Sequence, residues 1–143
     1  MPCTQQDFYD QANNYILSDT ANLPLQTGST SSSGTTLLKV YLEVTTVLHG
    51  HPNMISFNNF LASIWSTYSN HSNPCNFLLQ RYNHFNNQLA NNTYSVTQTL
   101  LKIAKRNYFA HMYNYCGCGA APPIAPPPSP SDQDAPTIRD EER

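Results

Sequence analysis

A change in composition after Gly119 limits what this chain can fold into. Seven of the 11 prolines of the 143-residue chain lie beyond that glycine, in a segment that ends in acidic residues. Proline lacks a backbone N–H and interrupts both helices and sheets. We therefore expect residues 120–143 to form a disordered, proline-rich and acidic tail. The folded domain is expected within residues 1–119.

Apolar residues recur at helical spacing in five segments of this domain, which predicts amphipathic helices. The stripes are Phe8, Ala12, Tyr15 and Ile16; Leu38, Leu42 and Thr45; Phe57, Phe60, Leu61, Ile64, Trp65 and Tyr68; Leu78, Tyr82, Phe85 and Leu89; and Val96, Leu100, Ile103, Tyr108, Met112 and Tyr115. Short connections between the stripes predict an all-α fold, a small antiparallel bundle of four to five helices.

Capping residues indicate where several of these helices begin. Thr4 and Asp7 have the spacing of a capping box and predict a first helix over residues 5–18. Asn73-Pro74 has the residues preferred at the N-cap and the first position of a helix, and it predicts the start of the fourth helix. Ser95 offers a similar start for the last helix.

Two segments of the domain are less regular. Residues 27–36 are rich in Ser, Thr and Gly and are expected to be a flexible linker within the bundle. Residues 40–48 are rich in β-branched side chains and could form a strand. We prefer a helix there, because Leu38, Leu42 and Thr45 follow helical spacing and do not alternate.

Charge is scarce and unevenly placed. Charged residues make up only 11% of the chain, and the net charge is −2. Residues 36–118 are basic, since Glu43 is their only acid. We expect Lys102, Lys105 and Arg106 on or near the polar side of the last helix. The basic charge is far sparser than the footprint of a nucleic-acid-binding protein, so no nucleic-acid partner is expected.

The sequence gives conflicting indications of the compartment. No segment reaches the about 20 apolar residues that a transmembrane helix needs. The first residues lack the basic and apolar regions of a signal peptide, so we favour a cytoplasmic location over secretion. The sequons that begin at Asn70 and Asn91 favour secretion instead, because they are potential acceptors of N-linked glycans.

The closely spaced cysteines Cys116 and Cys118 form the sharpest local motif. They could bind a soft metal, with His111 as a third ligand and Cys75 or His84 as a fourth. A dedicated zinc site usually has C-x-x-C spacing and a second pair of ligands, and this chain has neither. We therefore expect no metal and no other cofactor.

The cysteines also allow other chemistry. The disulfide candidates are Cys3, Cys75, Cys116 and Cys118, and the sequence does not choose between their possible pairings. S-acylation of the Cys116/Cys118 pair is a further alternative. The interpretation that we prefer is a set of ordinary free thiols.

Catalysis is not expected from this inventory of residues. General acid–base chemistry usually recruits paired carboxylates, or a histidine oriented by one. The core of the domain has only Glu43, and the chain contains no glycine-rich loop that could hold a phosphate. We therefore expect a protein that is not an enzyme.

These exclusions lead to a protein–protein interaction module, a small accessory or regulatory helical protein of the kind found among viral proteins. Two alternatives stay open: a secreted, cytokine-like helical ligand, and a thiol- or metal-dependent protein that uses Cys116 and Cys118. The partner is expected to be another protein or a second copy of the chain. The partner-binding candidates are Phe57, Phe60, Trp65, Tyr68, Tyr108, Tyr115, Pro123 and Pro126.

Overall fold

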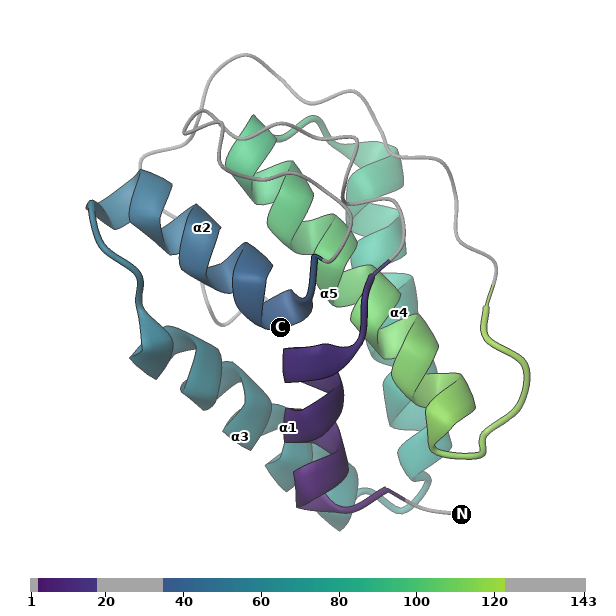
Figure 1. Ribbon diagram of the computed structural model, residues 1–143. Coiled ribbons are helices and arrows are strands. Elements are labelled where there is room, and N and C mark those ends of the chain that lie inside the picture. The colour runs from purple at the N-terminus through teal and green to yellow at the C-terminus, as the bar shows by residue number, and fades with distance from the viewer. Residues whose placement is uncertain (1–2, 18–34, 123–143) are drawn as a thin grey trace.

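A computed structural model describes residues 3–17 and 35–122, which form five helices and no strand (Figure 1). The helices are α1 (Gln5–Asn14), α2 (Leu37–His49), α3 (Met54–Asn70), α4 (Pro74–Asn91) and α5 (Val96–Tyr115). The predicted all-α bundle is confirmed, and residues 37–48 are helical. The proline-rich segment from residue 123 onward lies outside the described residues.

Each helix begins at a polar residue whose side-chain oxygen accepts a backbone N–H, as the sequence predicted for three of them. These N-caps are Thr4, Thr36, Asn53, Asn73 and Ser95. At α1 the box is complete, because the Asp7 carboxylate also accepts the Thr4 N–H at 2.8 Å. Local chemistry therefore sets the helix starts.

The first helix is shorter than expected. It ends at Asn14 and not at residue 18, because the backbone of Tyr15 is already extended (φ −78°, ψ 129°). The Leu17 N–H then donates a 2.8 Å hydrogen bond to the Thr35 carbonyl, which brings the chain back to the start of α2. Residue 18 itself lies outside the described residues.

The expected linker 27–36 is also corrected at its end. Thr35 and Thr36 are both buried, and Thr36 caps α2. They belong to the folded domain because their hydrogen bonds join α1 and α2. Residues 27–34 lie outside the described residues.

The last helix is the centre of the bundle. α5 runs alongside α4 for most of its length, and α1 and α2 also pack on it (Figure 1). Residues 99–110 are all buried, so this helix has no polar face in its middle. The expected positions of Lys102, Lys105 and Arg106 on a polar side are therefore wrong, and their exposed fractions are only 6%, 2% and 1%.

Candidate functional site

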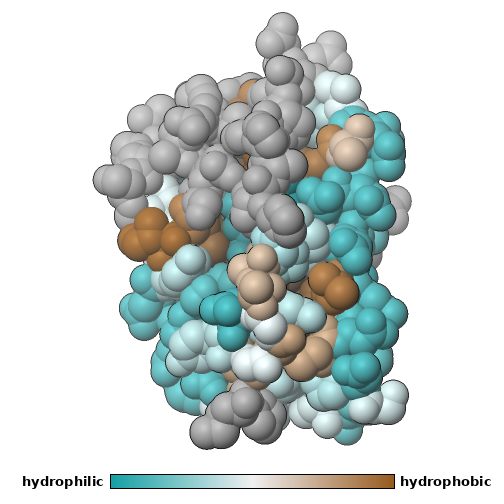
Figure 2. Space-filling model, turned by 90° about the vertical axis from the view of Figure 1, so that its right-hand side faces the viewer, coloured by the Kyte–Doolittle hydropathy of each residue, from teal (hydrophilic) through white to brown (hydrophobic). Residues whose placement is uncertain are grey.

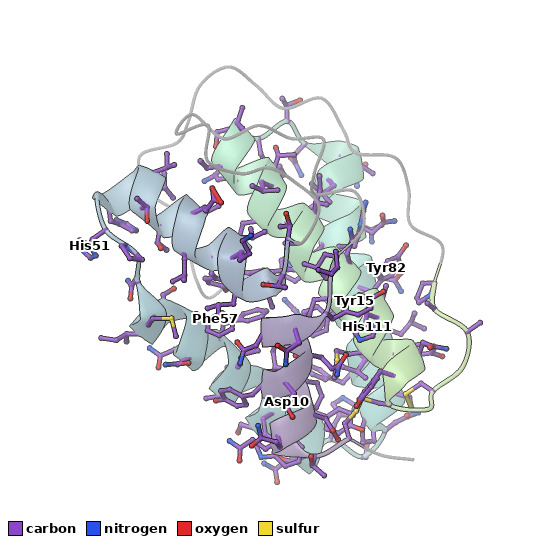
Figure 3. The ribbon with its side chains drawn as sticks, viewed as in Figure 1. Asp10, Tyr15, His51, Phe57, Tyr82 and His111 are labelled. Carbon is purple, nitrogen blue, oxygen red and sulfur yellow. A yellow bond between two sulfur atoms is a disulfide. The ribbon has the colours of Figure 1, made fainter. Side chains whose placement is uncertain are left out.

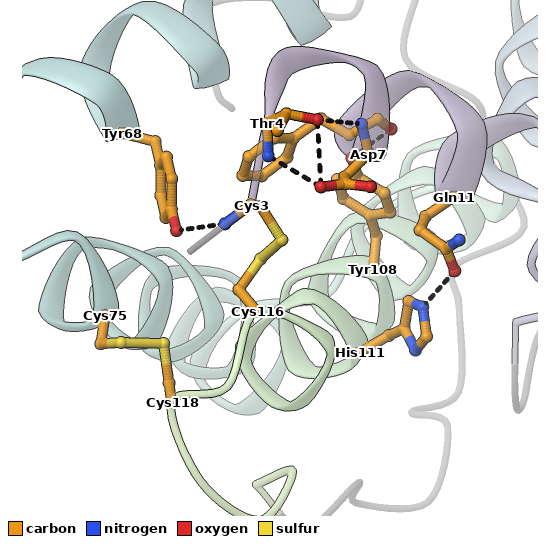
Figure 4. Close-up of a disulfide and its surroundings, with 11 residues drawn as sticks. Cys3, Thr4, Asp7, Gln11, Tyr68, Cys75, Tyr108, His111, Cys116 and Cys118 are labelled. Atoms are coloured by element: carbon orange, nitrogen blue, oxygen red, sulfur yellow. Dashed lines mark hydrogen bonds between the residues drawn. A yellow bond between two sulfur atoms is a disulfide. The ribbon is translucent and has the colours of Figure 1, made fainter. Parts of the chain in front are cut away.

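Two disulfides lie side by side where α5 ends (Figure 4). Cys3 is bonded to Cys116 across a sequence separation of 113 residues, and Cys75 is bonded to Cys118 across 43. Gly117, between the two α5 cysteines, has a φ of +81°, a left-handed conformation that glycine adopts without strain. The free thiols that we preferred from the sequence are not found, because all four cysteines are bonded.

These bonds fasten three chain segments to one another. Cys3 precedes α1, and Cys75 is the second residue of α4, so both elements are tied to the end of α5. The Cys3 N–H also donates to the Tyr68 hydroxyl at 3.1 Å, which adds α3 to this end of the bundle. We call Cys3, Cys75, Cys116 and Cys118 the disulfide end.

The disulfides remove the donors that the weak metal candidate needed. Cysteine binds metal as a thiolate, and a cystine sulfur is not one. Cys116 and Cys118 have different partners, and His111 lies in a separate contact described below. Within the described ranges, no group of three His, Cys, Asp or Glu residues is placed to hold a metal ion.

His111 is the most perturbed histidine, and it joins α5 to the end of α1. Its Nε2 lies 2.7 Å from Gln11 Oε1, and its ring stacks on Tyr15 with centroids 3.4 Å apart (Figure 3). The Tyr115 ring lies on its other neighbour position, at 5.5 Å. Burial lowers the pKa of His111 from 6.5 to about 4, so the ring is neutral at pH 7 and Nε2–H can donate to Gln11.

The same contact is part of an exposed apolar group. Tyr15, Ile16 and Tyr115 are exposed by 36%, 51% and 45%, and two of them flank His111. We call Tyr15, Ile16, His111 and Tyr115 the aromatic patch. Sequence reasoning placed Tyr15 and Ile16 in a helical core stripe, and only their position next to the helix end could have indicated exposure.

The rest of the described surface offers little comparable material. Met54 and Ile55 are exposed together at the start of α3, without an aromatic neighbour among the printed ring contacts of the described chain. On the face turned to the viewer in Figure 2, hydrophobic residues form small groups separated by hydrophilic ones. The aromatic patch is therefore the strongest candidate binding surface.

Most of the partner-binding candidates lie elsewhere. Phe57, Phe60, Tyr68 and Tyr108 are buried in the core, so they are not available as a surface in this conformation. Their stripes face other helices, which is the reason for the discrepancy. Trp65 is half-buried against Phe8, with ring centroids 6.0 Å apart. Tyr115 is exposed, and Pro123 and Pro126 lie outside the described residues.

The buried cations of α5 form a second unusual cluster, which sequence reasoning missed. Lys105 Nζ lies 4.7 Å from the ring centroid of Phe60 and 5.3 Å from that of Tyr41, close enough for cation–π attraction. Lys102 Nζ donates to Gln88 Oε1 at 2.9 Å. The available signal was the apolar sequence around them, which covers the whole circumference of the helix.

Arg106 is held by amide groups. Its Nε donates to Asn107 Oδ1 at 3.1 Å, and its Nη1 donates to Asn86 Oδ1 at 3.4 Å. Hydrogen bonds to such acceptors satisfy a buried guanidinium that would otherwise be strongly destabilising. These contacts give the cluster a structural role in joining α4 to α5.

The remaining candidates are placed on the surface. Asn70 and Asn91 are exposed, each as the last residue of its helix. His51 is exposed in the turn between α2 and α3, while His84 contacts the Phe85 ring at 4.9 Å. These histidines belong to different parts of the bundle.

Comparisons with known proteins add no identity. The chain matches no model of a protein family, no curated protein and no solved structure. None of the described helices is long and apolar enough to cross a bilayer. The function must therefore be argued from the disulfide end, the aromatic patch and the cation cluster.

Proposed function

We propose that this protein is a non-enzymatic helical ligand that binds another protein in an oxidising compartment. The observation that carries this proposal is the bonding of all four cysteines at one end of the bundle. Disulfides persist in secreted proteins and in comparable oxidising environments, and they are rare in the cytosol. This argument outweighs the cytoplasmic location that the sequence favoured.

The surroundings of the described carboxylates support binding over catalysis. Asp7 is engaged in the α1 capping box, and Asp10 accepts a 2.7 Å hydrogen bond from the Gln6 side chain. His111, the histidine with the strongest perturbation, contacts the amide of Gln11. A general base usually needs a pKa near the working pH, whereas the His111 pKa is about 4.

The aromatic patch is the surface that we assign to the partner. Tyrosine combines a large apolar ring with a polar hydroxyl, and it is enriched in the residues that dominate binding energy at interfaces. Tyr15 is fixed by its stack on His111, so little side-chain entropy is left to lose on binding. The patch spans two helices that Cys3–Cys116 keeps together.

The compartment is tested by mapping cysteines in protein purified from its native source. The protein is alkylated before and after reduction, and the cysteine-containing peptides are identified by mass. We expect labelling of Cys3, Cys75, Cys116 and Cys118 only after reduction. Labelling of all four without reduction would overturn the proposed compartment.

The surface is tested by affinity capture from the native source with the full chain. A Tyr15→Ala/Tyr115→Ala variant is expected to lose at least tenfold in affinity for the captured partner, as truncated anchor residues commonly do. Met54→Ala/Ile55→Ala is the matched control, because it removes a similar exposed apolar pair from α3. Equal loss in both variants, or in neither, would contradict the assignment.

A further inference from the structure

The end of α4 presents a sequon in an accessible form. Asn91, Asn92 and Thr93 are all exposed. The backbone of Asn92 is extended (φ −139°, ψ 157°), so the chain leaves the helix immediately after the acceptor asparagine. The amide of Asn91 and the hydroxyl of Thr93 are not engaged in any hydrogen bond within the described part of the chain. Both groups that define the sequon are therefore open to an enzyme.

The end of α3 repeats this arrangement with one difference. His71 is extended (φ −83°, ψ 139°), and Asn70 and Ser72 are exposed. However, Asn70 Nδ2 donates a 2.9 Å hydrogen bond to the Ser66 carbonyl. The net value of such an exposed hydrogen bond is about 1 kcal/mol, so it delays the acceptor without blocking it.

We propose that Asn91 is an N-glycosylation site and that Asn70 is a second, less fully occupied one. This inference rests on the proposed function, because N-glycans are added to chains that enter the secretory route. Only the last turn of each helix has to open to present the acceptor, and helix ends fray readily. Neither sequon needs the bundle to unfold.

The transfer uses a polyprenyl-diphosphate-linked oligosaccharide as donor. The Asn91 Nδ2 attacks the anomeric carbon, and the new N–C bond replaces the C–O bond to the diphosphate. The amide loses one proton to the transferase, and the polyprenyl diphosphate leaves with the bonding electrons. The products are an amide-linked glycan and the lipid diphosphate, without any oxidation or reduction.

The two acceptors lie at opposite ends of α4. Asn91 is its last residue, and Asn70 is separated from its first residue, Pro74, by a short turn beside Cys75. An 18-residue helix is about 27 Å long, so two glycans would shield both ends of this side of the bundle. Neither acceptor belongs to α1 or α5, which carry the aromatic patch.

The decisive measurement is peptide mapping of the full chain purified from its native source, before and after treatment with peptide:N-glycosidase. We expect a glycan on the Asn91 peptide and a lower occupancy on the Asn70 peptide, each converted to Asp by the enzyme. Unmodified peptides together with intact disulfides would overturn the glycosylation and leave the proposed compartment standing. Free thiols at all four cysteines would instead overturn the proposed function.

Variants expressed through a eukaryotic secretory pathway test the site itself. Asn91→Gln and Thr93→Ala are each expected to remove one glycosidase-sensitive band shift, and having two routes guards against a variant that fails to fold. Thr93→Ser and Asn92→Gln are the matched controls, because both keep the sequon and should keep the shift. Retention of the shift in both Asn91→Gln and Thr93→Ala would contradict the assignment.

Discussion

The two halves of α5 are equally buried, yet different interactions hold them in place. The first half is surrounded by rings and amide groups that accommodate Lys102, Lys105 and Arg106 without a covalent link. The second half continues into Cys116 and Cys118, whose bonds fasten it to α1 and α4. Burial alone therefore does not reveal what stabilises a helix. The first half should respond to shape and packing, and the second half to redox conditions.

Removing the long-range disulfide should have the largest effect. A cross-link over 113 residues stabilises the fold by about 5 kcal/mol in the chain-entropy estimate, and one over 43 residues by about 4. Cys3→Ser/Cys116→Ser should therefore cost more than Cys75→Ser/Cys118→Ser when free energies of unfolding are measured with denaturant. The reverse order would show that local packing around each bond, and not loop length, decides its contribution.

The first half of α5 is tested at Lys105, whose side chain lies among aromatic rings. Lys105→Ala should cost about 2–4 kcal/mol of unfolding free energy, since it leaves a cavity in the core. Lys105→Met should cost clearly less, because methionine restores most of the volume. Equal losses in the two variants would mean that the charge of Lys105 matters more than its packing.

The contact of His111 with α1 should make the stability of the second half depend on pH. The folded-state pKa is about 4 and the unfolded value is 6.5, so the unfolded chain binds more protons between these pH values. Stability should be constant above pH 6.5 and fall as the pH decreases towards 4. After allowance for the partial exposure of the ring, the loss should be about 1–2 kcal/mol.

A His111→Asn variant is the control for this pH dependence. It removes the titrating ring, while the other ionisable groups that titrate in this range stay the same. The difference between the two proteins in the free energy of unfolding should shrink as the pH falls from 6.5 to 4. A constant difference across that range would exclude a contribution from His111 protonation.

The smallest effect is expected at the exposed part of the aromatic patch. Tyr115→Ala should change the free energy of unfolding by less than about 1 kcal/mol, because nearly half of the side chain is already in water. Differential scanning calorimetry would detect a larger loss as a clear shift of the melting temperature. Such a shift would place Tyr115 in the structural half of the comparison and not at a binding surface.

The sequence predicted the parts of the fold that local chemistry decides. Thr4, Asn73 and Ser95 were recognised as helix starts because capping depends on residues within one turn. It failed where distant segments meet. The pairing of Cys3 with Cys116 requires both chain ends to reach one place, and no spacing rule encodes that.

The burial of the α5 cations was missed for a related reason. Charge normally indicates a solvated face, but in Arg106 that expectation was overridden by the central position of the helix. The amide acceptors Asn86 and Asn107 are ordinary polar residues until the packing of α4 on α5 is known. Asparagine-rich composition was visible, but its use in solvating buried cations was not.

The hydrogen bond from Leu17 to the carbonyl of Thr35 makes the points where the chain leaves α1 and enters α2 immediate neighbours. Anything joined between them starts and finishes at one spot on the domain. A fluorescent protein or an epitope tag whose own termini lie close together could thus be spliced in there without pulling on either helix. Such a fusion would allow the protein to be followed to its destination in living cells with both of its own termini unaltered.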